Sequence, residues 1–587
     1  MNPARTLRTL APLRWSQPLW RLRYAGERWA NRRRGTAPRR WEWPGEGAPP
    51  LRPGFPELPP AEAPGPGGER LVELLERGVF EHLEEAAEVG RERPDWRLGD
   101  RAADRLWTIT LHYHGWAWGL ARQAAAGGAA GERAAVLFRH YVGDWIRRAS
   151  LERPGSAALA WNAYATATRI GWWVRAYHLA GGALFAAAPR CEERFLRSLW
   201  QQASWLAAHL EWDLRANHLM RDLAGLAVAG RFFAGPVADR WLARASRLAL
   251  AQAAEQILPD GGHFERSPKY HLDVMEDLLT VARATGEEAV AARLAGCWAA
   301  AAEALAWMRH PDGDLAQLND GSRLGREVVE AALVAGHLVG RPVDPGPRRG
   351  GRHLADTGLV VWHGEPWSVL FDVGETGPAV QPGHAHADTL TLECSLRGAR
   401  LVVDPGSFGY DAGPRRDYDR STAAHSTVAI DDADSSEVWH VFRLGRRARP
   451  REVTVELRDD GLTASASHDG YRHLPGRPRH RRRLEVSEGG SLRLADRLEG
   501  GGHHRAEGGL LIEPGWAVEP QEDGWLLRRD ALRVRVRAAC SGGGSFERWT
   551  GTRPQHPVYG VERPAPWLGW RWSGEPPCEV ATELVEA

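Results

Sequence analysis

Four segments of the sequence carry residues that could do chemistry, and the clearest of them contains closely spaced histidines. His384 and His386 are two residues apart, so on a strand they would share one face. Asp404 ends a later strand-like run, and His425 precedes another. Two neutral imidazoles and one carboxylate suit zinc and leave one position open. The alternative is an ordinary pair of surface histidines on a strand.

The second segment spans residues 256–279 and gathers titratable groups next to a turn. Pro259-Asp260-Gly261-Gly262 predicts that turn. The polar residues between the turn and an amphipathic helix are His263, Glu265, Arg266, Ser267, Tyr270 and His271. This density of polar groups exceeds what a turn needs. A capped loop, with Ser267-Pro268 starting the helix, is the purely structural explanation and does not exclude a function.

The remaining two segments are less specific. Asn217 and His218 open an apolar helix, where an asparagine is more often a cap than a catalyst. Before His425 the chain carries a cluster that could bind carboxylates or sulfates bidentately, formed by Arg415, Arg416, Tyr418 and Arg420. Because arginine is frequent throughout this chain, a solvated charged loop is the alternative for each of these residues.

The elements that must position these residues change type once along the chain. From about residue 70 to 340, apolar residues recur at helical spacing, for example over 69–89, 131–149 and 238–258. Short Gly and Pro breaks between these segments suggest helical hairpins packed in a ring. After residues 346–352 the pattern alternates with period two in many short runs, which predicts antiparallel sheets in a sandwich.

We therefore predict an α+β multidomain fold with three parts. Residues 1–69 form an Arg-rich segment followed by a Pro/Gly-rich connector, 70–345 an α/α toroid, and 352–587 an antiparallel β-sandwich. The chain has 587 residues and a net charge of only +1, so any polyanion must be bound by a local basic cluster. Nucleic acid is not an expected partner, and a homodimer is left open.

Cysteine usage and apolar runs bound the cellular setting. The five cysteines are widely spaced and form no CxxC pair, which argues against disulfide frameworks and cysteine zinc sites. We find no signal-peptide core and no apolar run of the roughly 18 residues that a membrane span needs. The sequence predicts a cytoplasmic protein without a transmembrane segment, and leaves a periplasmic or secreted location open.

The order of the motifs is more specific than any one motif. The chain resembles the heparinase II/III-like lyases over residues 70–450, through LWTITLHYHGWAWG, WNAYATATRIGWW, NHL, QILPDGGHFERSPKYH, NDGS, PGHAHADTLTLE, VVDPGSFGY, RSTAAHSTV and SSEVWHVFRLGRRA. Beyond residue 450 the resemblance rests on the strand pattern only. It implies a helical toroid facing a β-sandwich, a lyase activity, and an anionic polysaccharide or oligosaccharide as substrate.

The resemblance also assigns roles to residues. It implies catalytic roles for Asn217, His218, Tyr270 and His384, and zinc ligation by His386, Asp404 and His425. The zinc is expected to organise the site. Expected substrate contacts are Arg169, Trp172, Glu265, Arg266, Tyr418 and Arg420. Two positions depart from the family pattern, Gly171 before Trp172 and Ser426 after His425, where relatives often carry asparagine.

The implied reaction is β-elimination of a uronic acid, and it needs these residue types. The C5 proton is too weakly acidic unless the charge of the neighbouring carboxylate is offset, which Asn217, with His218 or a nearby arginine, would do at about 3–4 kcal/mol per donor. Tyr270 or His218 would take the proton, and Tyr270 or His384 would protonate the leaving oxygen. Sequence alone leaves this assignment open.

Two other functions compete with the lyase. A non-catalytic carbohydrate-binding or polysaccharide-assembly protein could keep the same site. A glycoside hydrolase would need two facing carboxylates, for example Asp260 and Glu265. Product mass separates hydrolysis, which adds water, from elimination, which does not.

Overall fold

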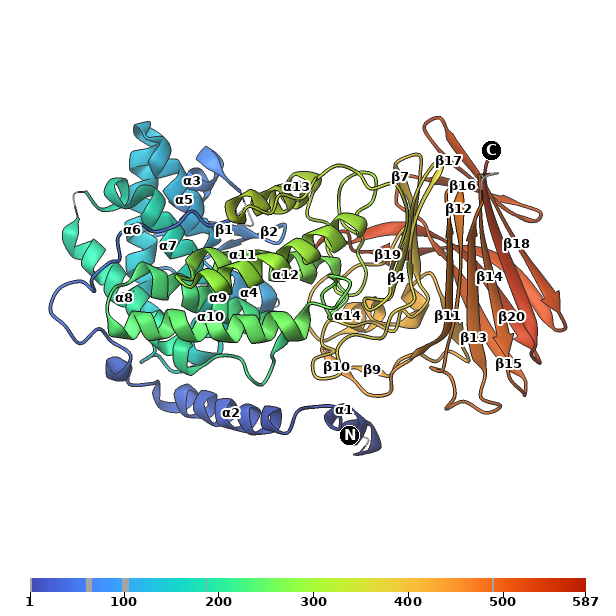
Figure 1. Ribbon diagram of the computed structural model, residues 1–587, viewed down its shortest axis with the longest axis horizontal. Coiled ribbons are helices and arrows are strands. Elements are labelled where there is room, and N and C mark those ends of the chain that lie inside the picture. Colours follow the sequence, from blue (N-terminus) through green and yellow to red (C-terminus); the bar gives the residue numbers. More distant parts are fainter. Residues whose placement is uncertain (1–2, 60–65, 98–104, 187, 488–489) are drawn as a thin grey trace.

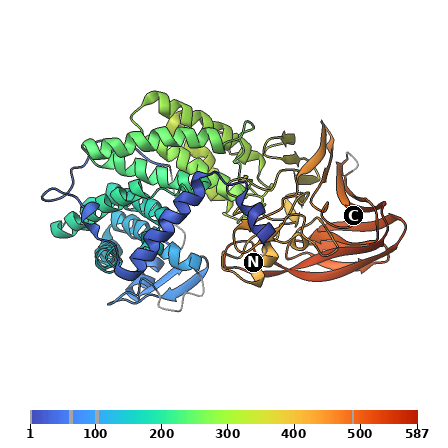
Figure 2. The same cartoon turned by 90° about the horizontal axis from the view of Figure 1, so that it is seen from below.

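The computed structural model describes residues 3–59, 66–97, 105–186, 188–487 and 490–587. They form a helical body and a strand-rich body side by side, with two N-terminal helices running along one side of both (Figure 1). These helices are α1 (Pro3–Leu10) and α2 (Ser16–Arg34). Seen from below, they lie on the face turned toward the reader (Figure 2).

The helical body is built from pairs of helices in two layers. Its elements are α3 (Gly68–Glu76), β1 (Val79–His82), β2 (Glu85–Glu88), α4 (Arg105–Leu111), α5 (Gly115–Ala126), α6 (Gly128–Arg148), α7 (Ala163–Phe185), α8 (Pro189–Ala208), α9 (Ala216–Phe232), α10 (Pro236–Gln256), α11 (Pro268–Ala284), α12 (Glu288–Trp307) and α13 (Arg326–Val334). Helices α5, α7, α9 and α11 contact one another in turn, and α6, α8, α10 and α12 cover them. The predicted toroid is confirmed.

The predicted helix over 69–89 is wrong in its second half, where the chain forms the β1–β2 hairpin. Helix α3 ends shortly before Gly78, whose φ is +76°, and Leu83 and Glu84 make the turn at φ +52° and +60°. The Phe80 ring lies edge-on against three aromatic rings of the body. Burial of this ring favours the hairpin over the helix that the local pattern indicates.

The strand-rich body contains three antiparallel sheets. The first has β3 (Gly350–Leu354), β4 (Leu359–His363), β5 (Trp367–Asp372), β6 (Leu392–Leu396) and β7 (Ala399–Val402) in that order. The largest, in spatial order, has β11 (Pro450–Arg458), β12 (Gly461–His468), β13 (Arg479–Val486), β14 (Ser491–Glu499), β21 (Cys578–Glu586), β18 (Leu532–Gly542), β17 (Gly524–Arg529) and β16 (Ala517–Gln521). The third has β19 (Ser545–Gln555), β20 (Arg563–Gly574), β15 (His504–Leu511) and β8 (Val428–Ile430).

One apolar core joins the first two sheets, so the predicted antiparallel sandwich is also confirmed. The site residues of the sandwich lie outside these two sheets, in the loop between β5 and β6, which carries His384 and His386, and in the segment between β7 and β11. This segment includes the short helix α14 (Pro414–Asp419) and the β9–β10 pair (Val438–Trp439 and Arg443–Leu444). It lies where the two bodies meet (Figure 1).

The two bodies are joined by apolar packing and by ion pairs. Side chains from the end of α12 and from β3, β4 and β5 form one buried cluster. Arg323 donates to both oxygens of Glu513, at 2.9 and 2.5 Å, and Arg400 donates to Asp312 at 2.6 Å. Residues of both bodies therefore stabilise the junction in which the site lies.

Helix α12 also passes a length and composition test for a membrane span. Half of its most apolar window is buried inside the fold, and core helices pass the same test. The test is therefore weak evidence for a span.

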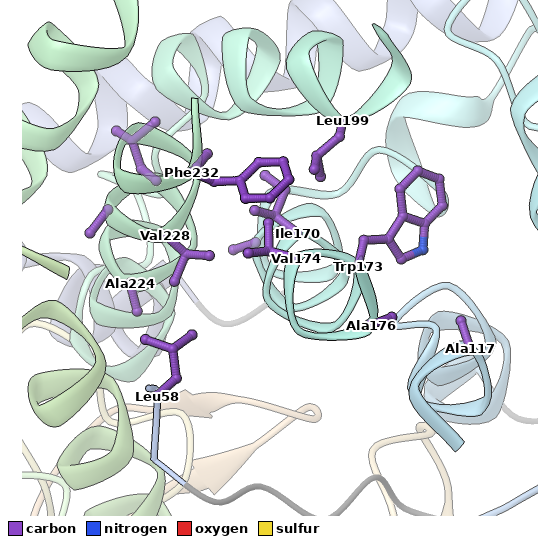
Figure 3. Close-up of a cluster of buried hydrophobic side chains, with 14 of the residues drawn as sticks. Leu58, Ala117, Ile170, Trp173, Val174, Ala176, Leu199, Ala224, Val228 and Phe232 are labelled. Atoms are coloured by element: carbon purple, nitrogen blue, oxygen red, sulfur yellow. The ribbon is translucent and has the colours of Figure 1, made fainter. Parts of the chain in front are cut away.

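Helices α7 and α9 approach each other closely along the middle and C-terminal half of α9. Ile170 and Val174 lie beside Val228 and Phe232 in the buried cluster of Figure 3. A Cβ on Gly225 would lie 2.7 Å from the Cα of Ala167, nearer than real contacts allow.

We predict that Gly225→Ala lowers the free energy of unfolding by about 1–3 kcal/mol, because the helices must move apart. The matched control is Gly171→Ala on α7, where a Cβ meets nothing within 4 Å. This control is expected to be neutral or to stabilise by up to ~1 kcal/mol, since alanine favours helix. Urea unfolding of both variants measures the difference, and equal effects would contradict the close packing.

Candidate active site

Asn217 lies in the first turn of α9, behind a strained stretch of backbone. Arg215 and Ala216 have φ of +67° and +51°, which side-chain-bearing residues rarely adopt. The helix cap is Arg215, without a side-chain cap bond, so Asn217 is not the cap that the simpler interpretation expected. Its N–H donates to Glu265 Oε1 at 3.1 Å, and its buried Oδ1 has no partner among the described residues. The side-chain amide is thus available to a ligand.

Glu265 connects this helix to the sandwich. It is buried, and its Oε2 accepts a 2.6 Å hydrogen bond from His384 Nδ1. Burial raises the pKa of Glu265, but His384, with smaller contributions from His263 and the Asn217 N–H, outweighs burial and the net pKa is lowered. Glu265 therefore supports His384 and Asn217, and its predicted contact with substrate would have to compete with these bonds.

Tyr270 and His384 meet face to face across the junction. Their ring centroids are 3.8 Å apart and their planes differ by 3°. Tyr270 comes from the first turn of α11, whereas His384 comes from the sandwich domain. Burial, followed by the neighbouring Tyr410, raises the pKa of Tyr270 well above its ordinary value. The phenol is therefore protonated at neutral pH.

The Tyr270 hydroxyl begins a chain of phenols that the sequence analysis did not identify. It lies 2.5 Å from the Tyr410 hydroxyl, which lies 2.8 Å from that of Tyr559. Lys269, the one lysine in the sequence, sits 4.4 Å from the centroid of the Tyr270 ring. Tyr410 stands in the VVDPGSFGY motif and could have been found there, whereas nothing in the local sequence marks Tyr559.

His218 lies next to a different carboxylate. Its Nδ1 is 3.1 Å from Glu211 Oε2, and its ring packs against Tyr164 with centroids 5.0 Å apart. Burial lowers the pKa of His218, but the charge of Glu211 and its hydrogen bond raise it, and the net pKa is above the ordinary value. About a quarter of the side chain, 27%, is exposed. His218 can therefore meet a ligand.

The three predicted metal ligands come together. Candidate ligand atoms of His386, Asp404 and His425 all lie within 4.8 Å of one another, and all three residues are buried. His425 Nδ1 donates to the Ser421 carbonyl at 2.7 Å, and His386 Nε2 donates to Asp320 at 2.8 Å. Both rings consequently direct unprotonated nitrogens toward the same point.

This arrangement fits a cation. His386 Nδ1 and His425 Nε2 are 3.2 Å apart, close to the ~3.3 Å between two imidazole ligands on tetrahedral zinc. Asp404 Oδ2 lies 3.7 Å from the His425 nitrogen and has no hydrogen-bond donor among the described residues. Two lone pairs and a carboxylate oxygen facing one another repel unless a positive charge lies between them. The donor set is the one that zinc prefers.

Asp320 holds this group against the toroid. The carboxylate is fully buried, and it accepts from Arg416, from His386 and, at 2.8 Å, from Ser407 Oγ. Burial raises the pKa of Asp320, but Arg416 and His386 together outweigh burial and keep the pKa far below the ordinary range. Arg416 was one of several arginines noted in its segment, and it is the one that reaches this site.

Two predicted substrate contacts lie in the protein core instead. Arg169 is fully buried, and its guanidinium bonds to a glutamine, a threonine and a backbone carbonyl, stacked on Trp145. Arg420 is buried and donates only to backbone carbonyls of the sandwich domain. Both arginines therefore hold the scaffold, and this corrects the predicted substrate contacts.

Three other predicted contacts are partly exposed. Arg266 donates to the backbone carbonyls of Asp356 and Thr357, so it bridges the two domains. Tyr418 donates to a carbonyl of β19 at 3.0 Å. Trp172 stacks beside Trp118, with centroids 6.1 Å apart. None of these bonds places the side chain beside Tyr270, and their contact with substrate stays a prediction.

We predict that Glu211→Gln lowers the pKa of His218, because the neighbouring negative charge is lost. In the native protein the raised pKa of His218 adds stability at low pH, and this contribution is lost as pH rises through the native pKa. NMR titration of the His218 ring measures the shift. Glu192→Gln, whose carboxylate binds Tyr177 elsewhere, is the control and should leave His218 unchanged. An unchanged pKa in Glu211→Gln would contradict the pairing.

Known proteins share this architecture. The family model "Heparinase II/III N-terminus" matches residues 79–337, and "Heparinase II/III-like, C-terminal" matches 346–554. A solved heparinase III aligns with TM-score 0.70 and 16% identity, over 85% of this chain and 80% of its own. The heparan sulfate lyase HepC from Pedobacter heparinus aligns with TM-score 0.59 and 16% identity, over 90% and 85%. At such identities the solved structures show the fold.

A curated relative, FtsZ-localized protein C of Caulobacter vibrioides, is 26% identical over 320 residues. That match covers 49% of this chain and 54% of the relative, so the chain spans about half the length of the curated relative. The two family models together extend over most of both domains and over every catalytic and metal residue predicted from the sequence. The chain belongs to the heparinase II/III-like family of polysaccharide lyases.

Proposed function

We propose that this protein cleaves a uronic-acid-containing polysaccharide or oligosaccharide by β-elimination, in the metabolism of an exopolysaccharide. One observation carries the proposal. Glu265 binds both the Asn217 backbone and His384, and His384 stacks on Tyr270, so three candidate catalytic groups from two domains share one support. A protein of this fold without lyase activity would not need to keep these three groups together.

The first task of the site is to offset the charge of the uronate. The Asn217 backbone is anchored by Glu265, and its side-chain amide makes no hydrogen bond among the described residues, so the Nδ2–H groups can donate to the carboxylate without breaking an internal bond. Hydrogen bonds from the Asn217 amide to the carboxylate would strengthen as negative charge moves onto it. Each such donor contributes about 3–4 kcal/mol to the transition state.

The second task is to move a proton from C5 to the leaving oxygen. Tyr270 is a neutral phenol with a raised pKa, which suits it to protonate the leaving oxygen. His218, on the toroid side, is the candidate base, and Glu211 orients its ring by binding Nδ1. His384 has Nδ1 engaged by Glu265, so its Nε2 is the atom left for the substrate or the leaving group.

The hydrolase alternative finds less support. Asp260 accepts from the Thr357 backbone and hydroxyl at 2.7 and 2.8 Å, and from Gly262 N–H at 3.1 Å. Glu265 is occupied by His384 and Asn217. Both carboxylates therefore hold structure, whereas a hydrolase needs one as an acid and the other as a base or nucleophile.

We propose that Tyr270→Phe lowers turnover at least ~10²-fold while glycan affinity changes little, because the phenol acts in the transition state. The assay follows the ultraviolet absorbance of the unsaturated uronate, and the mass of the product, on alginate, heparan sulfate, hyaluronan, chondroitin and bacterial exopolysaccharides. The control is Tyr471→Phe, whose hydroxyl donates to the Val428 carbonyl at 2.6 Å in the sandwich core. That variant should lose about 1 kcal/mol of stability and keep its activity.

Two results would count against the lyase. Tight glycan binding with no product, unchanged in Tyr270→Phe, would favour a carbohydrate-binding or assembly protein. A product heavier by one water would favour hydrolysis. Equal turnover of wild type and Tyr270→Phe would overturn the assignment of the catalytic tyrosine.

The metal is a second proposal, and it is zinc held by His386, Asp404 and His425. It would fix the sandwich loops around His384, and the elimination itself needs no activated water. Elemental analysis should give about one zinc per chain, and His386→Ala should lose the metal and lower the melting temperature. His353→Ala, a histidine of β3 outside the cluster, is the control. Metal-free wild type with an unaltered melting temperature would remove the proposal.

A further inference from the structure

The N-terminal helices expose an unusual number of large apolar side chains. Among the described residues, twelve large apolar side chains are exposed, and six of them lie between residues 7 and 29. They are Leu7, Leu10, Trp15, Leu19, Leu22 and Trp29. Trp15 is 82% and Leu22 is 71% exposed, values that a folded protein rarely leaves to water without a reason.

Helix α2 has two faces with different tasks. Its buried residues are Gln17, Tyr24 and Asn31, seven apart along one stripe. Gln17 donates to two backbone carbonyls, and Tyr24 donates to the Leu210 carbonyl at 2.7 Å. At about 100° per residue, the exposed apolar positions fall on the opposite side of the helix. The inner stripe therefore contacts the rest of the protein, whereas the outer stripe remains exposed.

The same segment concentrates positive charge. Residues 1–40 contain eleven arginines and one acidic residue, Glu27, whereas the whole chain has a net charge of +1. By the same spacing, Arg32 lies at one border of the outer apolar stripe of α2, Arg23 and Arg34 lie at the other, and Arg33 lies within it, 4.2 Å from the centroid of the Trp29 ring. These four side chains are exposed. An exposed apolar stripe accompanied by arginines is the pattern of a helix that lies in the plane of a lipid interface.

The segment is fixed to the folded domains, so its outer face is preformed. Arg8 donates to both oxygens of Glu437, at 2.9 and 2.8 Å, and Trp439 donates to Thr9 at 3.0 Å. Helix α1 is thereby tied to the sandwich, and α2 to the toroid. Both helices lie on the same face of the molecule (Figure 2).

We propose that this face, formed by α1 and α2, docks the protein on the surface of an anionic lipid bilayer. Leucine and tryptophan side chains enter the boundary between headgroups and acyl chains, while the flanking arginines bind the anionic headgroups. A polysaccharide would be recognised by the arginines but would leave the leucines in water. The lipid bilayer is the partner that uses both features, and the proposal stands independently of the lyase activity.

The test is flotation of the full-length protein with vesicles of phosphatidylglycerol mixed with phosphatidylcholine, compared with phosphatidylcholine alone. We expect binding to the anionic vesicles only, weakened by salt. The triple variant Leu19→Ser, Leu22→Ser, Trp29→Ser and the triple variant Arg32→Gln, Arg33→Gln, Arg34→Gln should each bind at least ~10-fold more weakly. Their melting temperatures and glycan cleavage should match wild type, since the changed side chains face away from both domains.

The matched control is Val136→Ser with Leu179→Ser, two exposed apolar positions on α6 and α7. It should bind vesicles as wild type does. The proposal is overturned if wild type does not float with anionic vesicles, or if the apolar triple variant floats equally well. It is also overturned if wild type is a dimer without affinity for vesicles and the same variant makes it a monomer.

Discussion

The junction between the two domains depends on one buried carboxylate, that of Asp320. It comes from the toroid side and binds Arg416 with both oxygens, while His386 and Ser407 donate to it as well. Taking such a charge out of water costs several kcal/mol, which is offset only when every oxygen is matched. The sandwich supplies all three partners. The carboxylate is therefore satisfied only when the domains are docked, and docking in turn sets the tautomer and direction of His386.

Glu265 repeats this arrangement on the other side of the site. A toroid carboxylate again binds a sandwich histidine, His384, and the same carboxylate anchors the backbone of Asn217. A group that stabilises developing charge is effective only if it is already oriented, so a catalytic set divided between two domains needs supports of this kind. Tyr270 then stacks on a ring that Glu265 has fixed. The catalytic residues and the metal ligands are thus held by two parallel carboxylate–histidine contacts.

The sequence predicted the parts of this structure that follow from periodicity. Helical and alternating patterns gave the toroid and the sandwich, because burial of one face imposes those periods. The expected strand face shared by His384 and His386 is wrong, because both lie in the loop between β5 and β6, and only the family resemblance separated a catalytic from a metal-binding histidine. The sequence did not predict the features that depend on contacts between residues far apart in the chain. The β1–β2 hairpin exists because Phe80 is buried among aromatic rings from other elements, and Tyr559 joins the site from the far end of the chain.

The arginines show most clearly why side-chain type alone could not identify the site. Arg169, Arg416 and Arg420 are all buried, yet their surroundings differ. Burial lowers the pKa of Arg169 well below its usual value, and burial with the nearby Arg416 lowers that of Arg420 to about 9, since carbonyls and amides are their main partners. Arg416 alone faces a carboxylate, and Asp320 outweighs burial and raises its pKa. A guanidinium that donates to backbone carbonyls stabilises the backbone of one domain. A guanidinium that pairs with a carboxylate of the other domain lies where both domains contribute residues to one site.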